Sequence, residues 1–217
     1  GVSDRTVYNG ERWSTARAYL DPARKRSNLK IQTGSIVHKI IFDGTKAVSV
    51  TYMTGSGALK SVQARKEIIL SAGAVGSPHI LMLSGIGPAA HLQDMGIDVL
   101  HDLPGVGQNL NDHPDFVLKY KCKRPVSFWP KTKGLAKLGA GIQWILTRRG
   151  IVSSNGFEGL GCIRSGKDVD YPDLQIIITP IAVDDATWTP LQEHAFQIHV
   201  GLMRAHSLSL IHISEPT

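Results

Sequence analysis

The stretch SAGAVGSPHILMLSGIG, from Ser71 to Gly87, carries the residues best suited to chemistry. Its first residues, Ser71, Ala72, Gly73 and Ala74, have small side chains that let another molecule approach the main chain closely. Backbone N–H groups in such a turn reach phosphate or ribose oxygens, and a nearby helix N-terminus adds partial positive charge. The turn therefore suits a dinucleotide, although the same small residues also allow tight packing between a strand and a helix.

The elements around this turn are expected in the order strand, turn, helix. The continuous apolar run Ile68–Leu70 predicts a strand that is covered on both faces. Ser77 and Pro78 predict the cap and first residue of a helix that Gly85 ends.

Antiparallel strands are predicted on the N-terminal side of the turn. Leu29–Phe42 is long, rich in β-branched residues and partly alternating, and Asp43-Gly44 is a strong two-residue hairpin signal. Lys46–Met53 would return antiparallel, followed by a third strand near Ala58–Gln63. These residues predict a three-stranded meander.

The remaining elements alternate between helices and strands. We expect a short helix at about Pro88–Met95, a strand at Phe116–Cys122, a helix at Leu135–Arg148, and strands within DLQIIITP and HAFQIHVGLMR. The fold class is therefore a mixed α/β (α+β) architecture with antiparallel hairpins and two intermixed subdomains.

Composition excludes several classes of protein. The 217 residues carry a formal charge of +6, and many cations lie between Lys119 and Arg149. The basic stretch has no nucleic-acid-binding motif, so we read it as a solvated face and expect no nucleic-acid partner, while peripheral contact with an acidic membrane surface stays open.

There is no apolar run of about 18 residues and no secretory pattern. Cys122 and Cys162 form no metal or disulfide framework, which favours a reducing, cytoplasmic compartment.

The motifs resemble the glucose–methanol–choline (GMC) flavin oxidoreductases. Ser71–Gly87 resembles the second signature of that family, in which small residues are followed by Ser-Pro, two aliphatic residues and Ser-Gly-Ile-Gly. STARAYL, RKEIILSAGA and LPGVGQNLNDHP also look like GMC segments, and the likeness is expected to run from Gly1 to about Arg204. KCKRPVS, SNGFEGLGCIRS and EHAFQIHVGLMR resemble the bacterial choline-oxidising members most, although other alcohol-oxidising members share much of this pattern.

The resemblance implies FAD as cofactor and assigns the residues that would bind it. Val37 would contact the adenine through its backbone, Ser71, Ala72 and Gly73 would line the ADP part, and Asn109, Asp112 and His113 would pass close to the flavin. His113 has a simpler alternative role, which is to cap the loop through its neighbours.

The resemblance also implies a substrate site that contains Asn155, Glu158 and His199. Glu158 would face the trimethylammonium group of choline, which is recognised by charge and by aromatic faces such as that of Phe157. Glu158 could instead be a solvent-facing carboxylate, and His199 could be a structural histidine. No residues are expected to bind a metal.

The implied activity is FAD-dependent oxidation of a primary alcohol, with choline and its oxidation to betaine aldehyde preferred. An alcohol substrate and an electron acceptor such as a respiratory quinone are the implied partners. The alternatives are another GMC alcohol dehydrogenase or a non-catalytic flavin-binding piece. Residues 1–113 would belong to the FAD-binding domain with its β-hairpin insertion, and residues 114–207 to the substrate domain.

Both ends of the chain bear on these expectations. The GxGxxG turn and the catalytic histidine of GMC enzymes have no counterpart in the 217 residues, so we expect the chain to be a central piece of the enzyme that is inactive alone. LSLIHISEPT, at Leu208–Thr217, resembles a translated sequencing-library adapter and is expected to be a non-native tail.

Overall fold

A computed structural model describes residues 6–203 of the protein. The chain forms two compact units, of which one contains residues 6–29 and 113–203 and the other contains residues 30–112. The boundary at residues 112 and 113 lies beside the predicted domain boundary. The assignment of 1–113 and 114–207 to cofactor and substrate domains stays a prediction, and the predicted tail at 208–217 lies outside the described residues.

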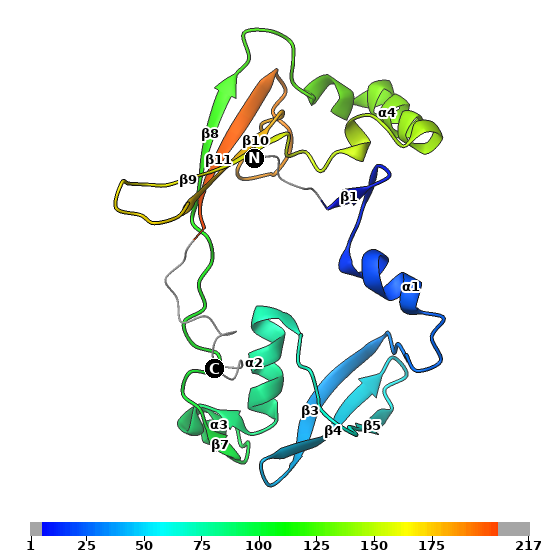
Figure 1. Ribbon diagram of the computed structural model, residues 1–217, viewed down its shortest axis with the longest axis vertical. Coiled ribbons are helices and arrows are strands. Elements are labelled where there is room, and N and C mark those ends of the chain that lie inside the picture. The colour runs from blue at the N-terminus through cyan, green and yellow to red at the C-terminus, as the bar shows by residue number, and fades with distance from the viewer. Residues whose placement is uncertain (1–5, 204–217) are drawn as a thin grey trace. The chain divides into compact units, whose positions relative to one another are not determined.

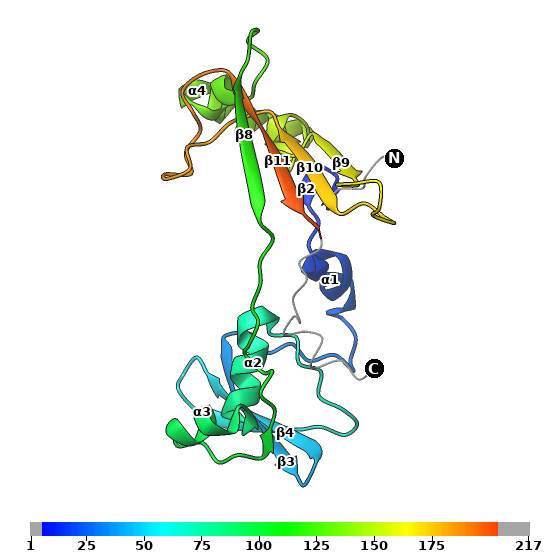
Figure 2. The ribbon, with the colours of Figure 1, turned by 90° about the vertical axis from the view of Figure 1, so that its left-hand side faces the viewer.

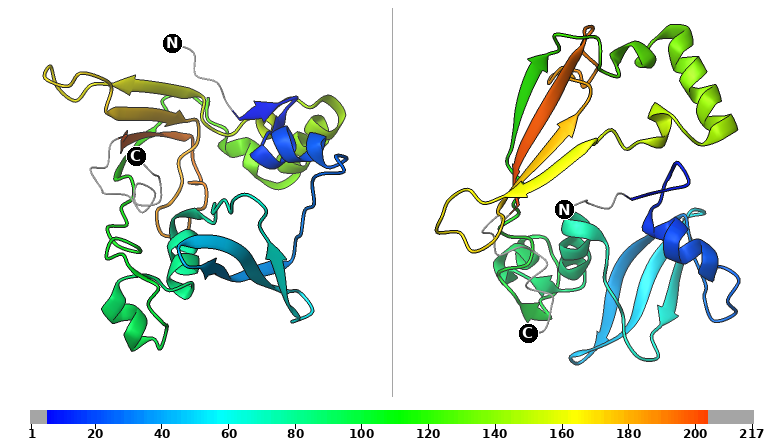
Figure 3. Two further views of the ribbon diagram at one scale, coloured as in Figure 1. Left: turned by 60° about the horizontal axis from the view of Figure 1, so that its bottom comes forward. Right: turned by 45° about the horizontal axis from the view of Figure 1, so that its top comes forward.

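The unit of residues 30–112 combines a three-stranded antiparallel sheet with two helices (Figures 1 and 3). Its elements are β3 (Ser35–Asp43), β4 (Lys46–Thr54), β5 (Leu59–Gln63), α2 (Gly73–Leu83), β6 (Ile86–Gly87), α3 (Ala89–Asp94) and β7 (His101–Asp102). The strand order β3-β4-β5 confirms the predicted meander. Gly44 has a positive φ of 58°, as the predicted hairpin turn between β3 and β4 requires.

Helix α2 confirms the predicted helix but begins at Gly73 instead of at Ser77. Pro78 therefore lies inside the helix, where its ring nitrogen cannot donate to the carbonyl one turn earlier. Gly73 and Gly76 at the start of α2 have weak helix propensity, so sequence reasoning placed the start too late. Ser84 caps the C-terminus and Gly85 follows with a φ of 85°, which confirms the predicted end.

The predicted strand at Ile68–Leu70 is wrong. These residues have no regular secondary structure and pair with no strand among residues 6–203, and Ile69 is 79% exposed. A continuous apolar run becomes a buried strand only when strands flank it on both sides. Here no such neighbours are present in the described part of the chain.

The second unit is built around a four-stranded antiparallel sheet of order β8-β11-β10-β9, seen side by side in Figure 2. Its elements are β1 (Val7–Tyr8), β2 (Glu11–Arg12), the π-helical turn η1 (Ala16–Leu20), α1 (Asp21–Ala23), β8 (Asp115–Lys121), the 3-10 helix η2 (Trp129–Thr132), α4 (Gly134–Thr147), the 3-10 helix η3 (Ile151–Ser153), β9 (Gly159–Ile163), β10 (Leu174–Thr179) and β11 (Ala195–Leu202). The three predicted strands and the predicted helix of this region are confirmed as β8, β10, β11 and α4.

The register of this sheet gives its two faces different chemistry. Residues paired across an antiparallel sheet point to the same face, and side chains alternate along each strand. Val117, His199, Ile177 and Leu160 form one row across the four strands. The same face also carries Asp115, Lys119, Gln197 and Thr179, whereas the opposite face carries Phe116, Leu118, Ile198 and Ile178. We call the face that carries His199 the polar face, and the face that carries Ile198 the apolar face.

Candidate functional site

The turn at Ser71–Gly76 leaves its backbone open. Ser71 to Val75 are exposed, and Gly73 has a φ of 84°, a conformation that residues with a β-carbon rarely adopt. A β-carbon added to Gly73 would meet no heavy atom within 4 Å. The space that a closely approaching ligand needs is therefore present at the start of α2.

Helix α2 fixes the shape of this turn. The Ala72 N–H donates to the Ser77 hydroxyl oxygen at 3.0 Å, and a β-carbon on Gly76 would meet the Ala72 β-carbon at 3.1 Å. The N–H groups that follow in the first turn of α2 point out of the helix N-terminus without intrahelical acceptors, which favours a phosphate there. At the other end, the Ser84 hydroxyl accepts from the Ile40 N–H at 2.9 Å and donates to the Ile80 carbonyl at 2.6 Å. These bonds tie α2 to β3.

The other predicted cofactor residues of this unit lie on β3 and on the loop after β7. Val37 pairs with Tyr52 on β4, beside an irregularity in the register, and it is exposed. Asn109 and Asp112 are exposed, and Asn109 has a positive φ of 56°. The loop is anchored at Val106, which is buried. The structure thus places Val37, the turn, Asn109 and Asp112 in one compact unit.

His199 belongs to a chain of hydrogen bonds on the polar face of the four-stranded sheet. The Val183 N–H donates to Gln197 Oε1 at 3.1 Å, which orients the amide so that Gln197 Nε2 faces His199 Nε2 at 2.7 Å. Since an amide nitrogen only donates, His199 Nε2 accepts and His199 Nδ1 carries the proton. That proton is donated to Asp115 Oδ2 at 2.6 Å. His199 is therefore held in one orientation and one tautomer.

Glu158 immediately precedes β9. Its N–H donates to the Ile178 carbonyl at 3.0 Å, and Glu158 Oε1 accepts from the Ser154 hydroxyl at 2.5 Å. Glu158 precedes Leu160 by two residues, so strand alternation places it on the face that carries His199. Two strand spacings separate β9 from β11, which amounts to about 10 Å. The arrangement can present a carboxylate and an imidazole to one small molecule.

Asn155 and His113 make local backbone contacts. Asn155 Oδ1 accepts from the Phe157 N–H at 3.2 Å, so its side chain closes the turn before β9. His113 Nδ1 lies 2.5 Å from the Leu202 carbonyl oxygen, which only accepts, so Nδ1 donates. His113 thereby joins the start of β8 to the end of β11. His113 belongs to the unit of residues 6–29 and 113–203, as the predicted substrate residues do. The other predicted cofactor residues belong to the unit of residues 30–112.

Sequence reasoning missed Asp115, Gln197 and Ser154. Gln197 precedes His199 by two residues in a strand, so alternation alone would have placed both on one face. Asp115 reaches His199 only because β8 pairs with β11, two strands that are far apart in the sequence. Within residues 6–203 no group of three or more His, Cys, Asp or Glu is arranged to hold a metal ion.

Comparison with known proteins decides the family. Residues 1–115, which make up more than half of the chain, match the family described as GMC oxidoreductase. The chain belongs to the GMC oxidoreductase family. The oxygen-dependent choline dehydrogenase of Pseudomonas syringae pv. tomato is 45% identical over 215 residues. That match covers 98% of this chain and 38% of the relative, so the chain spans about two fifths of the length of the relative.

Solved structures of two oxidases share the fold. A variant of formate oxidase from Aspergillus oryzae, studied for FAD modification, matches with a TM-score of 0.81 at 25% identity over 92% of this chain and 39% of its own. Pyridoxine 4-oxidase from Mesorbium loti matches with a TM-score of 0.68 at 26% identity over 92% of this chain and 35% of its own. The mixed α/β GMC architecture is therefore confirmed.

The extent of the match along the chain differs between relatives. The Pseudomonas match covers 98% of the chain, whereas the match to the oxygen-dependent choline dehydrogenase of Brucella ovis, 42% identical over 207 residues, covers 95% of it. The end of the GMC likeness near Arg204 and the non-native origin of Leu208–Thr217 stay predictions.

Proposed function

We propose that this chain supplies part of the FAD site and part of the alcohol site of an oxidoreductase that converts choline to betaine aldehyde. Membership of the GMC family and 45% identity to a protein named oxygen-dependent choline dehydrogenase support the proposal. The observation that carries it is the position of the open turn at Gly73, which lies directly at the N-terminus of helix α2.

The residues of this turn fit a dinucleotide. Ser71, Ala72 and Gly73 would lie against the ADP part of FAD, with a phosphate near the N-terminus of α2. Val37 would contact the adenine, while Asn109, Asp112 and His113 would approach the flavin. When bound, FAD supplies the acceptor for the hydride that leaves the carbinol carbon of the alcohol.

The polar face of the four-stranded sheet would hold the alcohol. Glu158 offers a negative charge to a quaternary ammonium group, which cannot donate an N–H hydrogen bond, and Asn155 shapes the turn in front of it. His199 would face the same substrate, with its proton held on the side of Asp115. Loss of the carbinol hydride together with the hydroxyl proton leaves the aldehyde. The predicted acceptor of that proton is a histidine outside the 217 residues.

The electrons removed from the alcohol require a terminal acceptor, for which we propose a respiratory quinone. We further propose a cytoplasmic location with peripheral contact at the inner face of the cell membrane, supported by the cations between Lys119 and Arg149. No helix in the described part of the chain is long and apolar enough to cross a membrane.

Substitution of Glu158 tests the choice of substrate in the complete enzyme. In Glu158→Gln, kcat/KM for choline should fall about tenfold more than kcat/KM for the neutral alcohol in which carbon replaces the quaternary nitrogen, because only choline loses a charge attraction. Steady-state kinetics on both alcohols measure this ratio. Glu193→Gln, which removes a carboxylate that pairs with Lys121, is the matched control and should leave the ratio unchanged. Equal losses on both alcohols in Glu158→Gln would contradict choline as the substrate.

A further inference from the structure

Helix α4 turns its apolar stripe outward. Leu135, Leu138, Ile142, Ile145 and Leu146 follow one another at intervals that place them on one side of the helix, and their exposed fractions lie between 48% and 85%. An amphipathic helix in a globular unit usually buries this stripe against the core. In α4 the stripe faces away from its own unit.

Contacts on the opposite side hold α4 in this orientation. Trp144 donates its indole N–H to the Gly10 carbonyl at 2.6 Å, and Arg148 stacks on the Trp144 ring at 4.4 Å from its centroid. Arg148 also pairs with Glu11 at 2.9 Å, and Ala140 is buried. Because these contacts bind the other side of α4 to the β1–β2 hairpin, the apolar stripe cannot simply rotate inward.

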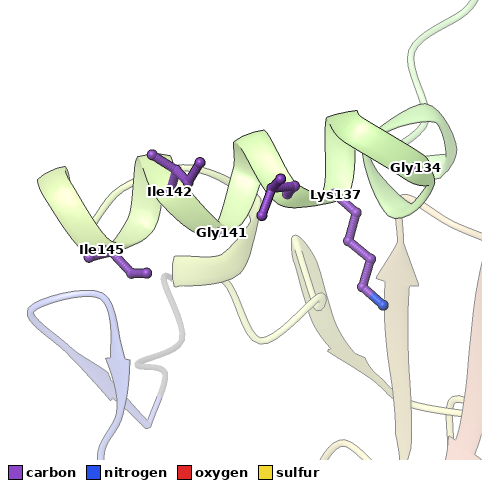
Figure 4. Close-up of a pocket in the computed structure, with 6 residues that line it drawn as sticks. Gly134, Lys137, Gly141, Ile142 and Ile145 are labelled. Carbon is purple, nitrogen blue, oxygen red and sulfur yellow. The ribbon is translucent and has the colours of Figure 1, made fainter.

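A shallow groove of about 400 Å³ runs along α4 (Figure 4). It is lined by Gly134, Lys137, Leu138, Gly141, Ile142 and Ile145. The glycines leave space between the aliphatic side chains, and Lys137 provides a cation at one side. The groove is thus apolar with a positively charged edge.

The sequence around α4 carries only one sign of charge. Between Asp115 and Glu158 there are nine Lys and Arg residues and no Asp or Glu. The rest of the chain has 15 basic and 18 acidic residues, a net charge of −3, so this segment accounts for the positive charge of the whole chain. Lys131, Lys137 and Arg149 form no ion pair with any of residues 6–203. These cations remain available to an anionic partner.

We propose that α4 and its flanking cations bind in the plane of an anionic lipid bilayer. An apolar stripe with Lys and Arg beside it is the pattern by which a helix lies at the headgroup boundary, where each cation strengthens binding to acidic lipids. A protein partner is less suited, because Lys is depleted in protein–protein interfaces. Lipid binding by α4 does not depend on the proposed flavin chemistry.

Sedimentation of the complete enzyme with vesicles tests this surface. The enzyme should bind vesicles of phosphatidylcholine and phosphatidylglycerol at a ratio of about 3:1 at least about tenfold more tightly than pure phosphatidylcholine vesicles. Binding should weaken in high salt, which screens the charge attraction. A folded enzyme that binds neither kind of vesicle would overturn the proposal and leave another protein segment as the cover of the stripe.

Two variants assign the binding to α4. Lys131→Gln/Lys137→Gln/Arg149→Gln should lower binding to the acidic vesicles about a hundredfold, at about fivefold for each cation. Lys60→Gln/Arg65→Gln/Lys66→Gln removes the same charge from exposed positions on and after β5 and should change binding less than about threefold. Equal losses in the two triple variants would overturn the assignment.

A variant of the stripe separates insertion from charge attraction. Ile142→Ser/Ile145→Ser keeps every cation and should lower binding to the acidic vesicles at least about tenfold. Far-ultraviolet circular dichroism establishes that each variant is folded. Unchanged binding in a folded stripe variant would overturn the proposal that α4 lies in the plane of the bilayer. If the stripe variant unfolds, the two triple cation variants still test the surface.

Discussion

The turn at Ser71–Gly76 and the polar face of the four-stranded sheet are two candidate binding surfaces of opposite kinds. The turn offers space and backbone, since Gly73 has no side chain and no heavy atom near its missing β-carbon. The sheet face offers the side chains of Gln197, His199 and Asp115, which already bind one another and the Val183 N–H. The turn should therefore lose its ligand when a side chain is added at Gly73. The polar face should lose the arrangement of its hydrogen bonds when one of its side chains is removed.

The largest effect is expected when the open space at Gly73 is filled. In the complete enzyme, Gly73→Val should lower the affinity for FAD at least about a hundredfold, because the new side chain occupies the space where the nucleotide would lie against the main chain. Titration of the apoprotein with FAD, followed by flavin fluorescence, measures the change.

Gly57→Val is the matched control for Gly73→Val. Gly57 has a φ of 80° and no heavy atom within 4 Å of its added β-carbon, so it carries the same backbone strain in the turn before β5. Both variants should lose about 1–2 kcal/mol of stability from a side chain in the left-handed region. Equal FAD affinity in the two variants would show that the Gly73 turn does not touch the nucleotide.

A smaller effect is expected from cutting the hydrogen-bond chain of the polar face. Gln197→Leu removes the partner of both the Val183 N–H and His199 at a position that is only 6% exposed. Leaving these groups unpaired should cost about 2–3 kcal/mol of unfolding free energy, measured by urea denaturation. Gln175→Leu is the control, since Gln175 lies on the same face and makes no side-chain hydrogen bond within residues 6–203, and it should cost less than about 1 kcal/mol.

The same contrast explains how much the sequence could predict. Features that depend on local chemistry were predicted correctly, such as the Asp43-Gly44 hairpin and the helix end at Gly85, because a turn type or a cap needs only a few neighbouring residues. The small-residue turn at Ser71 was visible for the same reason.

Features that depend on distant partners were missed. Ile68–Leu70 has the composition of a buried strand, but the strands that would flank it are not among the described residues. The contact between Asp115 and His199 follows from pairing of β8 with β11, which no local pattern specifies. The start of α2 was misplaced because Gly73 and Gly76 have weak helix propensity, yet the helix runs through both of them.

The smallest effect should come from a carboxylate at the rim of the sheet, outside both surfaces. The Ser165 hydroxyl and backbone N–H donate to Asp173 at 2.6 and 2.7 Å, and these bonds, the hydroxyl first, lower the pKa of Asp173 below its ordinary value. A lowered folded-state pKa means that the stabilisation is fully present above about pH 4, the unfolded value, and is lost as pH falls through the folded value.

Asp173→Asn should therefore flatten the loss of stability below about pH 4 without reproducing the pH-independent loss expected for Gln197→Leu. Denaturant midpoints at neutral and acid pH measure this difference. Asp168→Asn is the control in the same loop, because Asp168 is exposed and accepts no hydrogen bond from residues 6–203, and it should leave the pH dependence unchanged. If Asp173→Asn and wild type lost stability in parallel on acidification, the bonds from Ser165 would contribute nothing to folding. Only the bonds centred on Gln197 would then distinguish the sheet face from the turn at Gly73.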